Sequence, residues 1–247
     1  MTFAFWGLWL LGLLISTLIG SYVVKRHREY GLIVLGTLLA IYVVGANILV
    51  PRLLTFNIFG LSLVLVTGSI IWPFTSQLTD MVNEIYGKKA TYIVAAMAYV
   101  ANLMFVGFVK LGAQAEPLWG VDQEGWWLGY FGIAGRVAFA SLCSYTSSQI
   151  VDINIFSRIK KWAAERGDTG LFGLLVYSGG RSILSDGANM IVDNIVFYSI
   201  AFLGTMPFGA LLGLIGSSML AKVILSQIDL PFYWLFRVWT RGVKRDF

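Results

Sequence analysis

The sequence has 247 residues, of which 57% are hydrophobic, and its mean hydropathy is +0.76. A soluble domain of this length needs far less apolar surface, so we expect an all-α, polytopic helical membrane protein. The net charge of +5 does not indicate a nucleic-acid partner, because Lys and Arg stand in short clusters between apolar runs. The single cysteine, Cys143, excludes an internal disulfide, and the single histidine, His27, lies in a basic cluster, which argues against a His-based metal site.

Unbroken apolar runs predict the membrane spans, since roughly 20 apolar residues cross a bilayer. Basic residues follow the first run and do not precede it, which is the wrong charge order for a cleavable signal peptide. Gly179-Gly180 interrupts the sixth run, so we expect that span to begin at Ser182, and the acidic segment 112–129 reads as a loop. The predicted spans cover about residues 3–24, 32–50, 61–82, 90–111, 130–155, 182–203 and 207–236.

The basic clusters predict the orientation in the cell membrane. The segments 25–28, 88–89, 158–166 and 237–245 hold 13 of the 18 Lys and Arg residues. If the N-terminus lies outside and the chain crosses seven times, all four clusters fall on the cytoplasmic side, as positively charged loops usually do. We therefore expect a multi-pass protein of the cell membrane with a cytoplasmic C-terminus.

The stretch from Trp72 to Lys89 carries polar groups at the end of an apolar run. Gln77, Asp80 and Glu84 stand three and four residues apart, which places them on one face of a helix. Ionisable groups at membrane depth are expensive and usually face a pocket or a water-filled path. Trp72 and Phe74 flank Pro73 beside this cluster, where they are candidates to stack on a planar ligand.

The fifth and sixth spans carry similar polar stripes. Gln149 and Asp152 belong to the first stripe, and Asn189 and Asp193 to the second, at helical spacings of three and four. Hydrogen bonding between helices or an ion pair with Arg181 would also explain single members, but three carboxylates exceed what packing requires. The candidate binding residues are therefore Trp72, Phe74, Gln77, Asp80, Glu84, Gln149, Asp152, Arg181, Asn189 and Asp193.

Three blocks carry a family resemblance: 78–90 with its Thr-Asp, Glu and Gly, 136–158 with Gln149 and Asp152, and 181–202 with Asp193. Together they resemble the YhhQ/VUT family of queuosine-precursor transporters. The third block departs from the family pattern at Ser182, Asn189 and Met190, and Asn189 is the candidate to supply the missing amide. The resemblance implies a fold similar to vitamin-uptake membrane subunits, with an extra N-terminal span (1–30) before a six-span core (31–247).

The resemblance also implies uptake of 7-cyano- or 7-aminomethyl-7-deazaguanine, or of queuine, with no enzymatic activity, catalytic residue, metal or cofactor. The expected partners are the deazapurine base and the lipid bilayer; nucleic acid is not expected, and a homo-oligomer is compatible with the sequence. One alternative is a membrane subunit that binds another vitamin-like or nucleobase solute and needs a separate energising module. An intramembrane aspartyl protease is a further alternative, opposed by the lack of a Gly-x-Gly-Asp segment.

Overall fold

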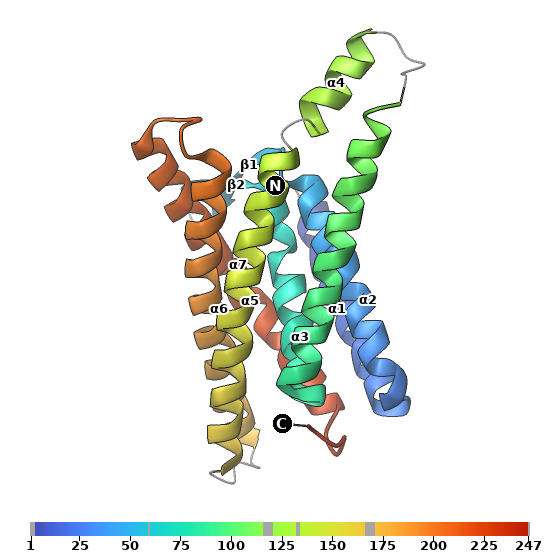
Figure 1. The fold of residues 1–247 in the computed structure, drawn as a ribbon. Coiled ribbons are helices and arrows are strands. Elements are labelled where there is room, and N and C mark those ends of the chain that lie inside the picture. The colour runs from blue at the N-terminus through green and yellow to red at the C-terminus, as the bar shows by residue number, and fades with distance from the viewer. Residues whose placement is uncertain (1–2, 59, 116–120, 132–133, 166–170, 247) are drawn as a thin grey trace.

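The computed structural model describes residues 3–58, 60–115, 121–131, 134–165 and 171–246. These residues form a helical bundle with a small β-hairpin near one end (Figure 1). In chain order the elements are α1 (Phe3–Arg26), α2 (Arg28–Leu49), β1 (Leu53–Ile58), β2 (Leu61–Val66), the 3-10 helix η1 (Thr67–Ile71), α3 (Trp72–Gly112), α4 (Val121–Phe131), α5 (Ala134–Glu165), α6 (Leu171–Phe202) and α7 (Phe208–Trp239).

Helix α3 consists of two halves that meet at Gly87. This residue has φ 77° and ψ 177°, a conformation that is open essentially only to glycine, while the residues on either side are helical. In Figure 1 the first half (72–86) descends from the hairpin and the second half (88–112) climbs back along the bundle. The chain therefore runs from end to end of the bundle in α1, α2, each half of α3, α5, α6 and α7.

Four candidate membrane spans stand out among the described residues by length and apolar composition. They are Ala4–Arg26, Arg28–Leu49, Thr67–Gly112, which contains both halves of α3, and Phe208–Trp239. Many of their apolar side chains lie on the outside of the bundle, as expected where lipid rather than water surrounds a helix. These features confirm the expected all-α, multi-pass membrane protein.

Three predicted element boundaries were wrong. Residues 61–66, assigned to the third span, form strand β2, which pairs antiparallel with β1 from Leu53↔Val66 to Ile58↔Leu61. The segment 112–129 is not a simple loop, because it contains most of α4. Helix α6 is continuous through Gly179-Gly180, because two glycines weaken a long helix without breaking it.

The strands form because a two-residue connection containing Gly60 joins two runs rich in β-branched and apolar residues. Gly60 has φ 79°, the left-handed conformation that tight hairpin loops require. Phe56, Leu63 and Leu65 point inward from the pair and pack with Trp9 of α1 and Leu225 of α7. The hairpin therefore closes the end of the bundle at which α2 ends and the first half of α3 begins.

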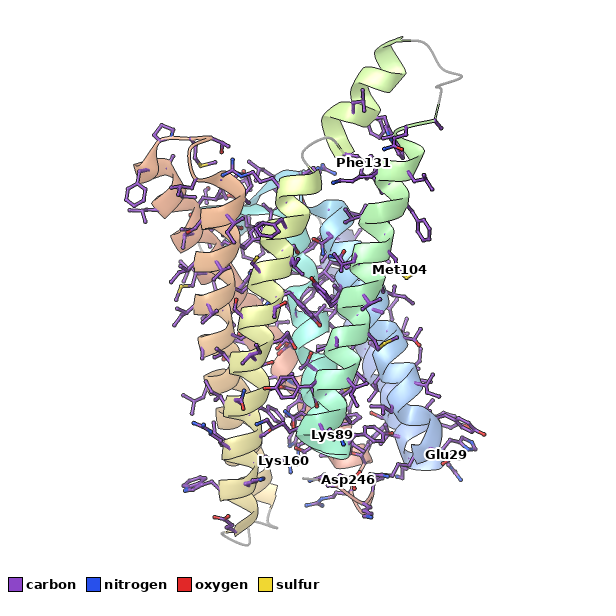
Figure 2. The ribbon with its side chains drawn as sticks, viewed as in Figure 1. Glu29, Lys89, Met104, Phe131, Lys160 and Asp246 are labelled. Atoms are coloured by element: carbon purple, nitrogen blue, oxygen red, sulfur yellow. The ribbon has the colours of Figure 1, made fainter. Side chains whose placement is uncertain are left out.

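The other end of the bundle holds the basic clusters and the C-terminus, and we call it the basic end. Lys89, Lys160, Glu29 and Asp246 gather there in Figure 2, while Phe131 lies at the opposite end. The Lys160 ammonium donates to the Asn83 carbonyl at 2.8 Å and to the Asp246 carbonyl at 2.6 Å. The C-terminal tail is thus tied across the end of α5 and the first half of α3.

Candidate functional site

A cavity of about 110 Å³, mainly apolar but lined by several polar side chains, lies within the bundle on the side of the hairpin. Its walls come from α2, β2, η1, both halves of α3, α5, α6 and α7, so residues far apart in the sequence meet around it. The hairpin and η1 shape one wall through Val66, Gly68 and Ser69. The Gly68 backbone packs so tightly on α2 that a Cβ there would lie 2.5 Å from the Ala46 carbonyl oxygen.

A buried ion pair belongs to the wall of this cavity. The Lys222 ammonium of α7 donates to the Asp193 carboxylate of α6 at 2.5 Å, and both residues line the cavity. Only 5% of the Lys222 side chain and 19% of the Asp193 side chain are exposed. Charges buried this far are stable only when they are paired and hydrogen bonded.

Several polar atoms in the cavity wall have no hydrogen-bond partner among the described residues. They are the side-chain carbonyl oxygens of Asn47 and Asn102 and the hydroxyl of Tyr145. These groups come from α2, the second half of α3 and α5, so they surround the space from three sides. Buried polar groups are nearly always satisfied by a partner, a water or a ligand. A polar ligand in the cavity would satisfy them.

Aromatic side chains complete the wall. Trp72 stands at the start of α3, and Tyr99, Phe197 and Tyr198 come from α3 and α6. The Tyr198 hydroxyl donates a hydrogen bond to the Ser218 hydroxyl of α7 at 2.8 Å, which fixes this ring against the helix that carries Lys222. A planar, partly polar molecule would find both stacking surfaces and hydrogen-bonding groups here.

A second polar group, the carboxylate cluster of Asp80, Asp152 and Asp186, is buried in the bundle. Oxygens of the three carboxylates lie within 4.8 Å of one another, and each residue is at most 2% exposed. The Ser76 hydroxyl donates to Asp186. Three carboxylates at this spacing repel one another unless a positive charge or a shared proton lies among them. Asp152 lies two helical turns along α5 from Tyr145 of the cavity wall.

Three predicted amide side chains are also buried near these groups. Gln77 and Gln149 each precede an aspartate of the carboxylate cluster by three residues, and Asn189 follows Asp186 by three, which places each amide on the face of its aspartate. Neither side-chain polar atom of Gln77, nor the carbonyl oxygen of Gln149, has a hydrogen-bond partner in the described part of the chain. The amides extend the polar interior from the cavity toward the basic end.

The other predicted residues lie elsewhere. Phe74 is buried away from the cavity, edge to face with Trp9 at 5.7 Å and Tyr42 at 5.1 Å, where it anchors α1. Glu84 lies at the basic end, where its carboxylate pairs with Arg237 at 3.0 Å and with Arg245 at 2.8 Å. Arg181 belongs to α6, but its side chain lies outside the described residues.

Sequence reasoning missed Lys222 and the two cavity asparagines. Lys222 and Asp229 are the charged residues within the apolar stretch 208–236, and such residues usually mark function. That signal could have found Lys222. Asn47 and Asn102 are isolated amides in apolar helices, and a sequence cannot tell which helix face meets which neighbour.

The chain is similar in sequence to known transporters. Residues 66–236 match the family model described as "Putative vitamin uptake transporter". The chain is also 27% identical over 208 residues to the "Probable queuosine precursor transporter" of Bacillus subtilis (strain 168), covering 83% of this chain and 84% of that protein. No solved structure matches the chain. Because the family model spans well over half of the sequence, including every helix that lines the cavity except α2, the chain belongs to this family of vitamin uptake transporters.

Proposed function

We propose that this membrane transporter imports queuosine precursors, which are 7-deazaguanine bases, through this cavity. The observation that carries the proposal is the cavity wall that joins Asp193, the unpartnered side-chain carbonyl oxygens of Asn47 and Asn102, and the ring of Trp72. The name of the B. subtilis relative supports the same class of substrate. The 7-cyano and 7-aminomethyl bases and queuine share the deazaguanine ring, so all three are candidate substrates.

The chemistry of the cavity suits such a ring. A carboxylate accepts hydrogen bonds from two adjacent N–H groups, which the pyrimidine part of a guanine ring offers. Trp72 supplies an aromatic surface for stacking, and the asparagine side chains supply further polar contacts. We assign first contact with the base to Asp193 and Trp72. Gln77, Asp80, Gln149, Asp152 and Asn189 would line the path from the cavity toward the basic end.

A second candidate is a substrate-binding subunit for another vitamin-like solute that needs a separate energising module. The description of the matched family, which names vitamins, favours this alternative. Purified protein reconstituted alone into lipid vesicles separates the two hypotheses. Uptake of a deazaguanine by such vesicles supports an autonomous transporter, whereas binding without uptake supports the subunit.

We also infer that the N-terminus lies outside the cell and that the basic end faces the cytoplasm. The gathering of Lys89, Lys160 and the C-terminal tail at one end of the bundle supports this orientation (Figure 2). In this arrangement the cavity lies nearer the outer side, as an importer that awaits its substrate requires. We further propose that residues 1–30 are an added span beside a six-span core of residues 31–247.

The direct test measures the thermal stability of purified protein against guanine, queuine and the two deazaguanine precursors. A ligand that binds only the folded protein raises its melting temperature with concentration. We expect a rise with the two precursors and with queuine, and none with adenine, which is added to the panel as a control. If the folded protein responds to none of these bases, the proposed substrate class is wrong and the family assignment stands.

A further inference from the structure

The Lys222–Asp193 pair places a strong donor and a strong acceptor side by side on the cavity wall. The distance from the Lys222 nitrogen to Asp193 Oδ2 is 2.5 Å, and the two residues come from neighbouring helices that pack together. A lysine in the middle of an apolar helix is expensive, and an apolar pair of similar volume would often stabilise the bundle more. Packing alone therefore does not explain the pair.

The hydrogen-bonding capacity of the pair exceeds what the pair itself uses. An ammonium group has three N–H donors and a carboxylate has about four acceptor sites, while one donor and one acceptor oxygen meet in the observed bond. Both residues line the cavity, and the Asp193 side chain keeps 19% of its surface accessible. A ligand can thus bond to both residues while they remain neighbours.

We propose that Lys222 and Asp193 together read the edge of the imported base, with Lys222 as a specificity-determining residue. This inference rests on the proposed function. A guanine-type edge presents, in order, a carbonyl oxygen, a ring N–H and an exocyclic amine. The ammonium donates to the carbonyl oxygen, and the carboxylate accepts from the ring N–H and the amine. The pair thus supplies the donor and the acceptor side by side, as this edge requires.

The same arrangement rejects other purine-like edges. An adenine-type ring has an amine where guanine has the carbonyl, so this amine would face the Lys222 ammonium, which has no acceptor. Its unprotonated ring nitrogen would face the Asp193 carboxylate, which has no donor. A hypoxanthine-type ring keeps the carbonyl and the ring N–H and lacks the amine, so it loses one bond. Buried groups left unpaired by the wrong ligand give strong discrimination.

The first test uses the natural protein and three ligands: 7-cyano-7-deazaguanine, the analogue without the exocyclic amine, and the 7-deaza-adenine analogue. We expect the loss of the amine to weaken binding by about 10- to 100-fold, as for a lost bond to a charged group, and the adenine analogue not to bind. If the three ligands bind with equal affinity, Lys222 and Asp193 do not recognise the edge of the base and the proposal is wrong. If 7-cyano-7-deazaguanine itself does not bind, the proposed function is wrong. This outcome differs from equal binding of the three ligands, which contradicts only the role of Lys222 and Asp193.

The second test exchanges the charges in the double variant Asp193→Lys/Lys222→Asp. The exchange keeps an ion pair between α6 and α7 and reverses the order of donor and acceptor. We expect a melting temperature near that of the natural protein and the loss of deazaguanine binding. Retained binding with unchanged preference would show a purely structural pair. A double variant that fails to fold leaves the ligand series to decide.

A matched control removes an ion pair far from the cavity. Arg28 pairs with Asp246 at 2.6 Å at the basic end, so Arg28→Gln breaks a pair without touching the cavity wall. This variant keeps the ligand preference of the natural protein if the Lys222–Asp193 pair sets that preference. The comparison variant, Lys222→Gln, removes the ammonium from the cavity wall, and we expect it to weaken the preference for the guanine-type edge over the adenine-type edge. An equal change of preference in Arg28→Gln would overturn the assignment, because the loss of any ion pair would then have the same effect.

Discussion

The Glu84 carboxylate illustrates how individual residues stabilise the basic end. It is 1% exposed and lies between Arg237 of α7 and Arg245 of the C-terminal tail, with the Tyr233 hydroxyl at 3.5 Å. One carboxylate thus joins the first half of α3 to two later segments. Removing one member of a buried ion pair leaves uncompensated charge and is costly, even where the pair as a whole adds little stability.

We expect Glu84→Gln to destabilise the protein by about 3–5 kcal/mol, because two arginines lose their counter-ion in a buried place. Unfolding of the detergent-solubilised variant measures this loss. Glu29→Gln is the matched control, since its carboxylate lies on the surface, 3.9 Å from the His27 ring nitrogen. Exposed ion pairs contribute little to stability, so this control should be as stable as the natural protein. Equal losses in the two variants would contradict the assigned role of Glu84.

The spacing of the polar residues correctly predicted that they are buried. It did not predict how far along the bundle each of them lies. Gln77, Asp80 and Glu84 are all buried, as one polar face of an apolar helix implies. The helix rises about 6 Å between Asp80 and Glu84, which carries the latter from the carboxylate cluster to the arginines of the basic end. Those arginines come from the far end of the chain, and no local pattern relates them to Glu84. Their pairing therefore required the fold.

At the scale of elements, Gly87 decides the path of α3. Its φ of 77° and ψ of 177° let the second half of the helix turn back along the bundle. The following turn is fixed by the Thr91 hydroxyl, which donates to the Gly87 carbonyl at 2.9 Å. Any residue with a Cβ is strained in this conformation, typically by about 1–3 kcal/mol.

We expect Gly87→Ala to lower the free energy of unfolding by about 1–3 kcal/mol, which the melting temperature reports. Gly107→Ala, in the second half of the same helix, is the control. A Cβ at Gly107 meets no atom within 4 Å, and alanine favours helix over glycine by about 1 kcal/mol. The control should thus be neutral or slightly stabilising. A Gly87→Ala variant as stable as the control would show that α3 tolerates a different path.

The sequence identified α1, α2 and α7 nearly to their ends because their apolar runs are long and bounded by charges or proline. It failed between Leu53 and Ile71, where an apolar run suits a strand or a helix equally. The hairpin is stabilised by contacts with Trp9 and Leu225, which are distant in sequence. Tertiary packing therefore decided the secondary structure at this point, and Gly60 was the local signal for the turn.

At the scale of the whole molecule, the two ends of the bundle differ in chemistry. One end carries the hairpin and the nearby cavity, and the other carries the basic clusters and the C-terminal tail. The tail is held there by Asp246, whose backbone N–H donates to the Ile85 carbonyl at 2.9 Å and whose carboxylate pairs with Arg28 at 2.6 Å. The C-terminal tail therefore links the helices at the basic end, and the cavity lies nearer the hairpin end.

The proposed orientation predicts which ends of the helices can be labelled from outside the cell. Cys143 is the single cysteine, so Cys143→Ala gives a cysteine-free background. Two exposed positions report on the two ends: Thr205, between α6 and α7 at the hairpin end, and Lys88, beside Gly87 at the basic end. On intact cells a membrane-impermeant maleimide should label Thr205→Cys and spare Lys88→Cys until the membrane is opened. The positive-inside distribution of Lys and Arg is the physical reason, because basic clusters are retained on the cytoplasmic side. The opposite labelling pattern would invert the orientation and place the cavity on the cytoplasmic side, as in a transporter about to release its substrate.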